Sequence, residues 1–151
     1  MSVPSMSVPA SAEALFERLR LLDLPHGDFA VFGSGPLLVR GLIGSAGDLD
    51  VLARGPAWEA ALVAGEGVYL HEHDVDFVDV GLGVTLGREW GIGDFDVDEL
   101  IATAEVIDGL PFVLLEHVVA YKRIAARRKD RVHLALLAES GLLEGDAGAE
   151  R

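Results

Sequence analysis

Apolar residues recur along the chain at two spacings, one typical of helices and the other of strands. From Ser11 to Leu22 they return every three or four positions, which predicts an amphipathic helix capped by Ser11. Residues 29–32 form an apolar run that predicts a buried strand, and residues 48–52 alternate as a half-buried strand does. Further strands are expected at 68–70, 75–80, 106–107 and 112–113, and further helices at 36–42, 55–63, 96–102, 115–127 and 130–139.

Strands that alternate with helices predict an α/β or α+β domain, with helices packed on a sheet. The 151 residues have the length of one domain. We expect a single domain over residues 12–143, a disordered lead over 1–11 and a disordered tail over 144–151. No apolar run approaches the ~20 residues needed to cross a bilayer, and cysteine is absent. A cytoplasmic protein without a membrane partner is therefore expected.

The charge is large and unevenly placed. The net charge is -13, which repels phosphate backbones, so an extended nucleic-acid surface is not expected. Between Glu66 and Asp108 there are 12 acidic residues and one basic residue. Between Lys122 and Arg131 there are six basic residues and one acidic residue. Such a division suits a protein that binds a polyphosphate through a divalent metal.

A glycine-serine pair and an Asp-x-Asp strand supply the candidate chemistry. Gly33 lets the backbone turn sharply after a strand, and Ser34 with the amides of the following helix forms an anion site. Because side chains alternate along a strand, Asp48 and Asp50 project from one face. Two neighbouring carboxylates repel each other unless a cation lies between them, and Mg²⁺ takes protein carboxylates together with substrate phosphates. The sequence therefore predicts a magnesium site beside an anion site.

A third carboxylate would complete a two-metal site. Asp76 is flanked by apolar residues in a predicted strand, and Asp79 repeats the pattern three residues later. The two fall on opposite faces of a regular strand, so only one can join the site. We take Asp76 as the third acid, with Asp79 as the alternative. Two Mg²⁺ ions could then activate a hydroxyl and hold a triphosphate.

The order of these motifs resembles the nucleotidyltransferase superfamily, which has the polymerase-beta-like fold. Lys122 followed by Arg127-Arg128-Lys129-Asp130 is similar to the closing helices of small bacterial and archaeal members. The resemblance implies a mixed β-sheet with helices packed on it and two C-terminal helices. It also implies Mg²⁺-dependent transfer of a nucleoside monophosphate from a nucleoside triphosphate to a hydroxyl of an acceptor, which is a small molecule, a protein or an RNA end.

The resemblance also implies roles for individual residues. The catalytic and metal-binding residues would be Asp48, Asp50 and Asp76, and the nucleotide-binding residues would be Gly33, Ser34 and Lys122. Some members of the superfamily have kept the fold and lost the activity. The alternative is therefore a non-catalytic module of the same fold that acts as an antitoxin-like or partner-binding protein.

Three further residues or pairs allow more than one interpretation. Lys122 interrupts an apolar helical stripe, so it must reach a triphosphate or an acidic residue such as Asp96 or Asp98. Asp130 is expected to be the N-cap of the last helix. His71 and His73, together with a nearby carboxylate, offer a rival zinc or iron site, for which a polar turn is the simpler interpretation.

Overall fold

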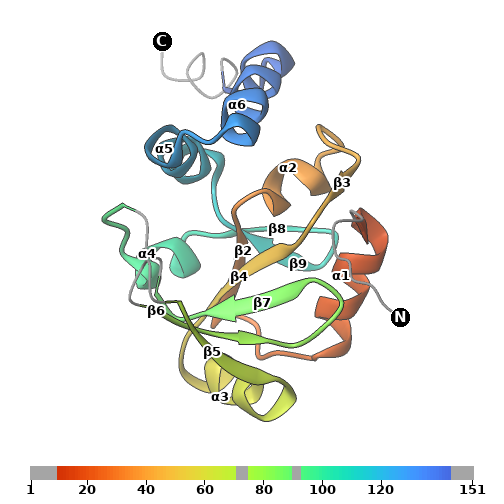
Figure 1. Ribbon diagram of the computed structural model, residues 1–151, viewed down its shortest axis with the longest axis vertical. Helices are drawn as coiled ribbons and strands as arrows, with labels where there is room; N and C mark the ends of the chain where they lie inside the picture. The colour runs from red at the N-terminus through yellow and green to blue at the C-terminus, as the bar shows by residue number, and fades with distance from the viewer. Residues whose placement is uncertain (1–9, 71–74, 90–92, 144–151) are drawn as a thin grey trace.

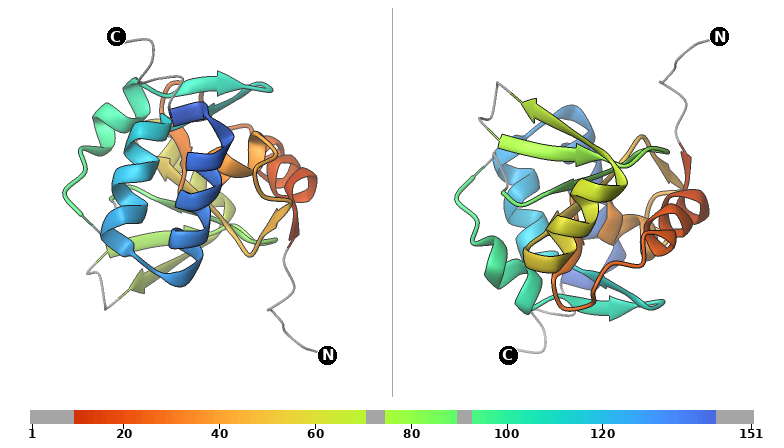
Figure 2. Two further views of the ribbon diagram at one scale, coloured as in Figure 1. Left: turned by 90° about the horizontal axis from the view of Figure 1, so that it is seen from above. Right: turned by 90° about the horizontal axis from the view of Figure 1, so that it is seen from below.

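A mixed β-sheet runs through the middle of the protein, and helices cover both of its faces (Figures 1 and 2). The structure is a computed structural model that describes residues 10–70, 75–89 and 93–143. Within these residues the sheet has seven strands in the order β5-β6-β7-β4-β2-β9-β8, and β1 and β3 form a separate pair. The predicted α+β class and the two C-terminal helices are confirmed.

The strands are β1 (Ala10–Ser11), β2 (Phe29–Phe32), β3 (Ser45–Ala46), β4 (Leu49–Ala53), β5 (Glu66–Leu70), β6 (Val75–Asp79), β7 (Val84–Gly87), β8 (Glu105–Ile107) and β9 (Leu110–Phe112). The helices are α1 (Ala12–Leu21), α2 (Gly35–Val39), α3 (Gly55–Ala64), α4 (Val97–Ala102), α5 (Leu115–Ala125) and α6 (Arg128–Ser140). β4 lies between β2, to which it is antiparallel, and β7, to which it is parallel.

Capping residues stabilise the ends of several helices, among them the predicted cap Ser11. The Ser11 hydroxyl accepts a hydrogen bond from the backbone N of Ala14 at 3.2 Å, and a carboxylate oxygen of Asp96 accepts one from the backbone N of Glu99 at 3.3 Å. Each bond satisfies an amide that has no partner inside the helix. α6 is followed by Gly141 with φ 80, a left-handed conformation that favours glycine and ends the helix.

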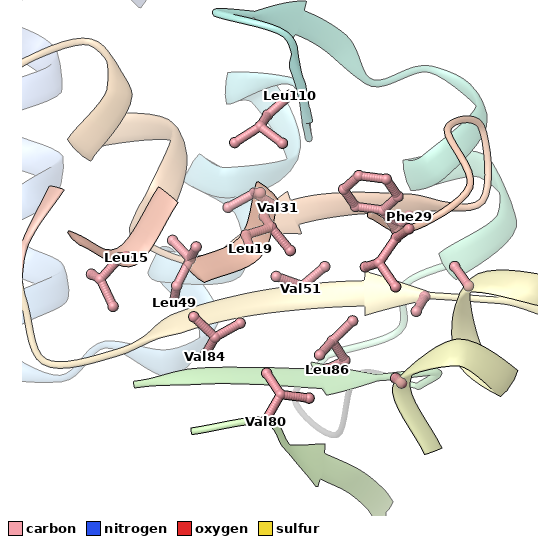
Figure 3. Packing of buried hydrophobic residues seen from close by; sticks show 14 of the residues in the cluster. Leu15, Leu19, Phe29, Val31, Leu49, Val51, Val80, Val84, Leu86 and Leu110 are labelled. Carbon is pink, nitrogen blue, oxygen red and sulfur yellow. The ribbon is translucent and has the colours of Figure 1, made fainter. Parts of the chain in front are cut away.

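Two apolar cores lie on opposite faces of the sheet. Because side chains alternate along β4, Leu49 and Val51 join a core with α1 and α3, whereas Leu52 joins a core with α4, α5 and α6. Figure 3 shows part of the first core, in which Leu15 and Leu19 of α1 lie over the sheet. Asp50 shares the face of Leu52, so its carboxylate is on the side that the C-terminal helices cover.

β7 lies in the glycine-rich stretch for which the sequence predicts no element. Its Val84 and Leu86 are buried on the face of α1 and α3, while Thr85 faces the other way. β7 separates β6 from β4, and Thr85 pairs with Asp50 on one side and with Asp79 on the other. The strand next to the Asp-x-Asp strand is therefore β7 and not β6.

The helices α5 and α6 lie side by side over one end of the molecule (Figure 2). Ala126 ends α5 with φ 50, and this left-handed residue turns the chain directly into α6. The tight connection brings Lys122 of α5 opposite the first turns of α6. Side chains from both helices therefore meet at the sheet face that carries Asp50.

The two ends of the chain fall mostly outside the described ranges. Residues 1–9 of the expected lead and residues 144–151 of the expected tail are not among them. Ala10 and Ser11, by contrast, pair with Ala46 and Ser45. In the part of the chain that the structure describes, no helix combines the length and the apolar content that crossing a membrane requires.

Candidate functional site

The carboxylate of Asp50 lies directly against the backbone of Gly33. Phe32 pairs with Asp50 across β2 and β4, so the turn after β2 begins beside this side chain. Gly33 has φ +67, and a Cβ added there would lie 3.0 Å from Asp50 Oδ2. Only glycine combines this left-handed conformation with so close an approach. The structure thus brings the Gly33-Ser34 turn and Asp50 together.

Asp48 lines a pocket of about 210 Å³ beside this turn. Ser34 forms another part of its wall, and Lys129 and His133 reach it from α6. The remaining lining residues are Ile43, Ser45, Ala46 and Gly47. One exposed carboxylate, a hydroxyl, an imidazole and an ammonium therefore face a common space.

The ionised form of Asp50 is disfavoured by burial and by a neighbouring negative charge. Burial, and then the neighbouring charge of Asp48, raise the pKa of Asp50 from 3.8 to about 6. A hydrogen bond of 3.2 Å from Thr85 Oγ1 to Asp50 Oδ1 opposes this shift, as do the positive charges of Lys129 and Arg127. A cation between the two carboxylates would remove the repulsion.

The structure places Asp76, the predicted third acid, on the sheet face opposite the Asp50 carboxylate. A carboxylate oxygen of Asp76 lies 3.9 Å from Arg88 Nη2, and the Arg88 guanidinium lies over the ring of Trp58 on α3. α3 covers the sheet face opposite Asp50. The physical reason is the alternation of side chains along β6, which puts Asp76 on the same face as the buried Val78.

Asp79 is on the same sheet face as Asp50, but a strand intervenes. The row across the sheet runs from Asp50 to Thr85 to Asp79. Asp79 is exposed, and its Oδ1 accepts a hydrogen bond from the backbone N of Gly81 at 2.8 Å. The position beside Asp50 on the adjacent strand therefore carries the hydroxyl of Thr85 where a third carboxylate was expected.

The candidate metal ligands that the structure brings together are the carboxylates of Asp48 and Asp50. Across residues 10–70, 75–89 and 93–143, no group of three or more histidine or acidic side chains lies close enough to hold a metal ion. The expected two-metal site needs a third carboxylate and stays a prediction, since Asp76 lies on the other face of the sheet. His71 and His73 lie outside the described residues, so the rival zinc or iron site stays a prediction.

Lys122 is completely buried, and its ammonium group meets three acceptors. Its Nζ lies 3.3 Å from Asp130 Oδ1, 3.0 Å from His133 Nδ1 and 3.3 Å from Ser34 Oγ. Its counter-charge is therefore Asp130, and neither Asp96 nor Asp98 takes that role. Burial lowers the pKa of Lys122, and the charge of Asp130 opposes that shift. Lys122 lies behind Ser34, where it does not itself line the pocket.

Asp130 joins Lys122 to the start of α6. Its buried carboxylate accepts hydrogen bonds from Arg127 Nε at 2.6 Å, Arg127 Nη2 at 3.1 Å and the backbone N of Arg127 at 3.1 Å. Burial by itself would raise the pKa of Asp130, but the hydrogen bonds from Arg127 outweigh it and lower the pKa to about 2. Arg127 is the N-cap residue, so Asp130 caps α6 from its third position rather than from the N-cap position predicted.

His133 completes the wall between Lys122 and the pocket. Its Nδ1 lies 3.0 Å from Lys122 Nζ and 3.5 Å from Ser34 Oγ. Burial, and then the positive charge of Lys122, lower the pKa of His133 to about 4. The imidazole is therefore neutral at pH 7.

Thr85 and His133 were not identified from the sequence. His133 had a usable signal, because Asp130 and His133 are three residues apart on one helix and so share a face. The signal at Thr85 was weak, since the alternation of Val84, Thr85 and Leu86 is short and lies between two glycines.

Comparisons of the chain with protein-family models, with curated proteins and with solved structures give no significant match.

Proposed function

We propose that this protein is a cytoplasmic, Mg²⁺-dependent nucleotidyltransferase, which moves a nucleoside monophosphate from a nucleoside triphosphate to a hydroxyl of an acceptor. One observation carries the proposal. The Asp50 carboxylate, beside Asp48, is packed against Gly33 at the start of a turn whose Ser34 shares a pocket with Lys129 and His133. Groups that hold a cation and groups that hold an anion therefore lie side by side.

The carboxylate pair fits Mg²⁺ by its chemistry. Mg²⁺ prefers oxygen ligands and is usually bound by one or two carboxylates, with substrate phosphates and water completing its shell. Asp48 and Asp50 supply that number, and burial together with the charge of Asp48 raises the pKa of Asp50. When bound, Mg²⁺ would neutralise charge on the phosphates and align the reacting groups.

The other wall of the pocket supplies positive charge and hydrogen-bond donors for a triphosphate. Lys129 contributes an ammonium group, and Ser34 lies at the start of the turn into α2. Lys122 holds Ser34 from behind rather than touching the ligand itself. Asp76 has no role in this mechanism.

The acceptor is a small molecule, a protein or an RNA end rather than a long duplex. The net charge of -13 repels an extended phosphate backbone, while the pocket of about 210 Å³ admits a short polyphosphate. Among the described residues, the cation that lines the pocket is Lys129, which is too small a footprint for a long nucleic acid.

Thermal melts test the proposal. The wild type is expected to melt at a higher temperature with Mg²⁺ and at least one of the four ribonucleoside triphosphates, because binding to the native state alone stabilises it by about 2.7 kcal/mol at a hundredfold excess over Kd. Asp50→Asn should lose this shift and keep its fold. Labelled triphosphates incubated with candidate acceptors then test transfer. A wild type that shows no shift with any of the four would refute the proposal.

One observation favours a second candidate, a non-catalytic module of the same fold that binds a nucleotide or a partner protein. Thr85 occupies the position beside Asp50 on the neighbouring strand, so the described part of the site has two carboxylates and not three. Nucleotide-dependent stabilisation without transfer to any acceptor, in a protein with both aspartates intact, would favour this candidate.

A further inference from the structure

The buried ammonium group of Lys122 determines where protons reside on its neighbours. An ammonium has three N–H donors and no acceptor. All three donors find acceptors, on Asp130, His133 and Ser34, at 3.3, 3.0 and 3.3 Å. Lys122 and Arg127 together carry two positive charges against the single charge of Asp130, so the cluster retains a net positive charge beside the pocket.

The contact with His133 has a direct consequence for its ring. Nδ1 can accept from Lys122 only if it carries no proton, and in a neutral imidazole the other nitrogen, Nε2, must then carry one. The ring is neutral because burial and the charge of Lys122 lower its pKa to about 4. The charges of Lys129, Arg127 and Asp130 also act on the ring. Those of Lys129 and Arg127 reinforce the neutral state, and that of Asp130 opposes it.

The contact with Ser34 also restricts where a hydrogen can lie, in this case the hydroxyl hydrogen of Ser34. Since Ser34 Oγ accepts from Lys122, its own hydroxyl hydrogen cannot point back to Lys122. The Nδ1 lone pair of His133 is already engaged by Lys122 at 3.0 Å, while Ser34 Oγ is 3.5 Å away, so His133 is a poor acceptor for Ser34. The Ser34 hydroxyl is therefore available as a donor to the pocket.

We infer that Lys122 is a positioning residue that fixes His133 as the Nε2–H tautomer, so that Nε2–H of His133 and the Ser34 hydroxyl act as paired donors to one phosphate group of the substrate. The inference deepens the proposed function, because it names the anion that this wall recognises and the residue that recognises it. Both residues line the same pocket, and Lys129 and the Asp48 carboxylate lie around them. A wall of neutral and positive donors suits a phosphate that also contacts a metal ion at Asp48.

Two substitutions of His133 separate this role from a structural one. In His133→Asn the side-chain oxygen can take the place of Nδ1, so the contact with Lys122 survives and the Nε2 donor is lost. In His133→Gln the longer side chain can place an N–H donor near Nε2, while the contact with Lys122 is lost. If His133 only stabilises the fold, His133→Asn should behave like the wild type and His133→Gln should be the weaker protein in every assay.

Titration calorimetry with inorganic tripolyphosphate and Mg²⁺ distinguishes the two cases. We expect His133→Asn to bind about tenfold or more weakly than the wild type, because one charge-assisted hydrogen bond is lost. His133→Gln should stay within a few-fold of the wild type. Equal affinity of His133→Asn and the wild type would overturn the inference, as would a wild type that does not bind tripolyphosphate.

The tautomer itself is visible by nuclear magnetic resonance without any ligand. Correlation of the ring nitrogens with the ring carbon-bound protons at pH 7 should show His133 protonated at Nε2 in the wild type. In Lys122→Met the constraint is gone, and the Nδ1–H form should become populated. A wild type protonated at Nδ1 would refute the inference. Because this measurement involves no nucleotide and no transfer, it can succeed even if the proposed nucleotidyl transfer fails, and the reverse also holds.

Discussion

The surroundings of Asp50 disfavour its ionised form, and the pH dependence of the protein's stability measures how strongly. Its pKa in the native state is about 6, against 3.8 for an ordinary aspartate. The native state therefore holds the proton more tightly than the unfolded chain does. The stabilising contribution of protonated Asp50 is complete below pH 3.8 and is lost as the pH rises through about 6.

Asp50→Asn removes this ionisation and keeps an oxygen that can accept from Thr85. Without metal at neutral pH, we expect Asp50→Asn to be more stable than the wild type, by on the order of 2 kcal/mol. The difference between the two proteins should vanish below pH 3.8. Urea unfolding in the presence of a chelator, repeated from pH 3.5 to 7.5, measures it. A difference that stays constant across this range would mean that Asp50 titrates normally.

Gly33 combines a left-handed backbone with a close approach of the Asp50 carboxylate. A comparison with Gly41 separates these two effects. Gly33→Ala places a methyl group in a left-handed conformation, at φ +67, and 3.0 Å from Asp50 Oδ2. Gly41 has a similar φ of +77, but a Cβ there meets nothing within 4 Å. Both substitutions should cost about 1–2 kcal/mol of stability from backbone strain. Only Gly33→Ala should also weaken Mg²⁺ binding, because only it displaces the Asp50 carboxylate. Equal Mg²⁺ affinity of the two variants would mean that the Gly33 contact does not position Asp50.

At the scale of elements, the α5–α6 pair is held together by an ionic cluster whose members are not equivalent. Asp130→Asn leaves Lys122 buried with no anionic partner among the contacts that the structure shows, which should cost about 3–5 kcal/mol. Lys122→Met leaves Asp130 bonded to Arg127, so its cost should be smaller, about 1–2 kcal/mol. Chemical unfolding of the two single variants provides the comparison. A larger loss in Lys122→Met would show that Arg127 does not sustain Asp130 alone.

The same cluster predicts the acid limb of stability. The pKa of Asp130 is lowered from 3.8 to about 2, so its stabilising contribution is complete above pH 3.8 and is lost as the pH falls toward 2. In Asp130→Asn the decline in stability over this interval should be shallower than in the wild type. Thermal melts at closely spaced pH values below 4 measure the slope. Parallel slopes would remove Asp130 as its source.

β7 offers a way to add the carboxylate that the site lacks. Thr85→Asp would place a third acidic side chain directly beside Asp50, in the register that the structure shows. Without metal the variant should be less stable than the wild type, because the new carboxylate then lies between those of Asp50 and Asp79. With Mg²⁺ it should be stabilised more strongly than the wild type. Thermal melts with and without Mg²⁺ check both signs, and Thr85→Asn serves as the uncharged control.

At the scale of the whole molecule, the elements and the site differ in how far the sequence predicted them. Strands β2 and β4, the helix cap at Ser11, the short helix α4 and the two closing helices follow from local patterns, and the structure confirms them. These features depend on residues within a few positions of each other. Local periodicity and capping therefore sufficed for most of the fold.

The third acid could not be settled in this way. Helices cover both faces of the sheet, so the alternation along β6 shows that Asp76 and Asp79 differ in face but not which face carries the site. The choice also required β7, whose glycines hide its pattern. Similarly, the sequence showed that Lys122 needs a partner, but the left-handed turn at Ala126 that brings Asp130 to it depends on how the two helices pack. Long-range register and helix packing decided what local patterns left open.

The pocket joins distant parts of the chain, since the contacts of Ser34 with Lys122 and His133 span 88 and 99 residues. During synthesis, Gly33, Ser34, Asp48 and Asp50 leave the ribosome long before α6 does. A nascent chain thus carries the candidate metal ligands early, but it can bring His133 and Lys129 to Ser34 only after α6 has emerged and docked. A ligand that bridges both walls would therefore act as a clasp, since opening α5 and α6 away from the sheet would also require releasing the ligand.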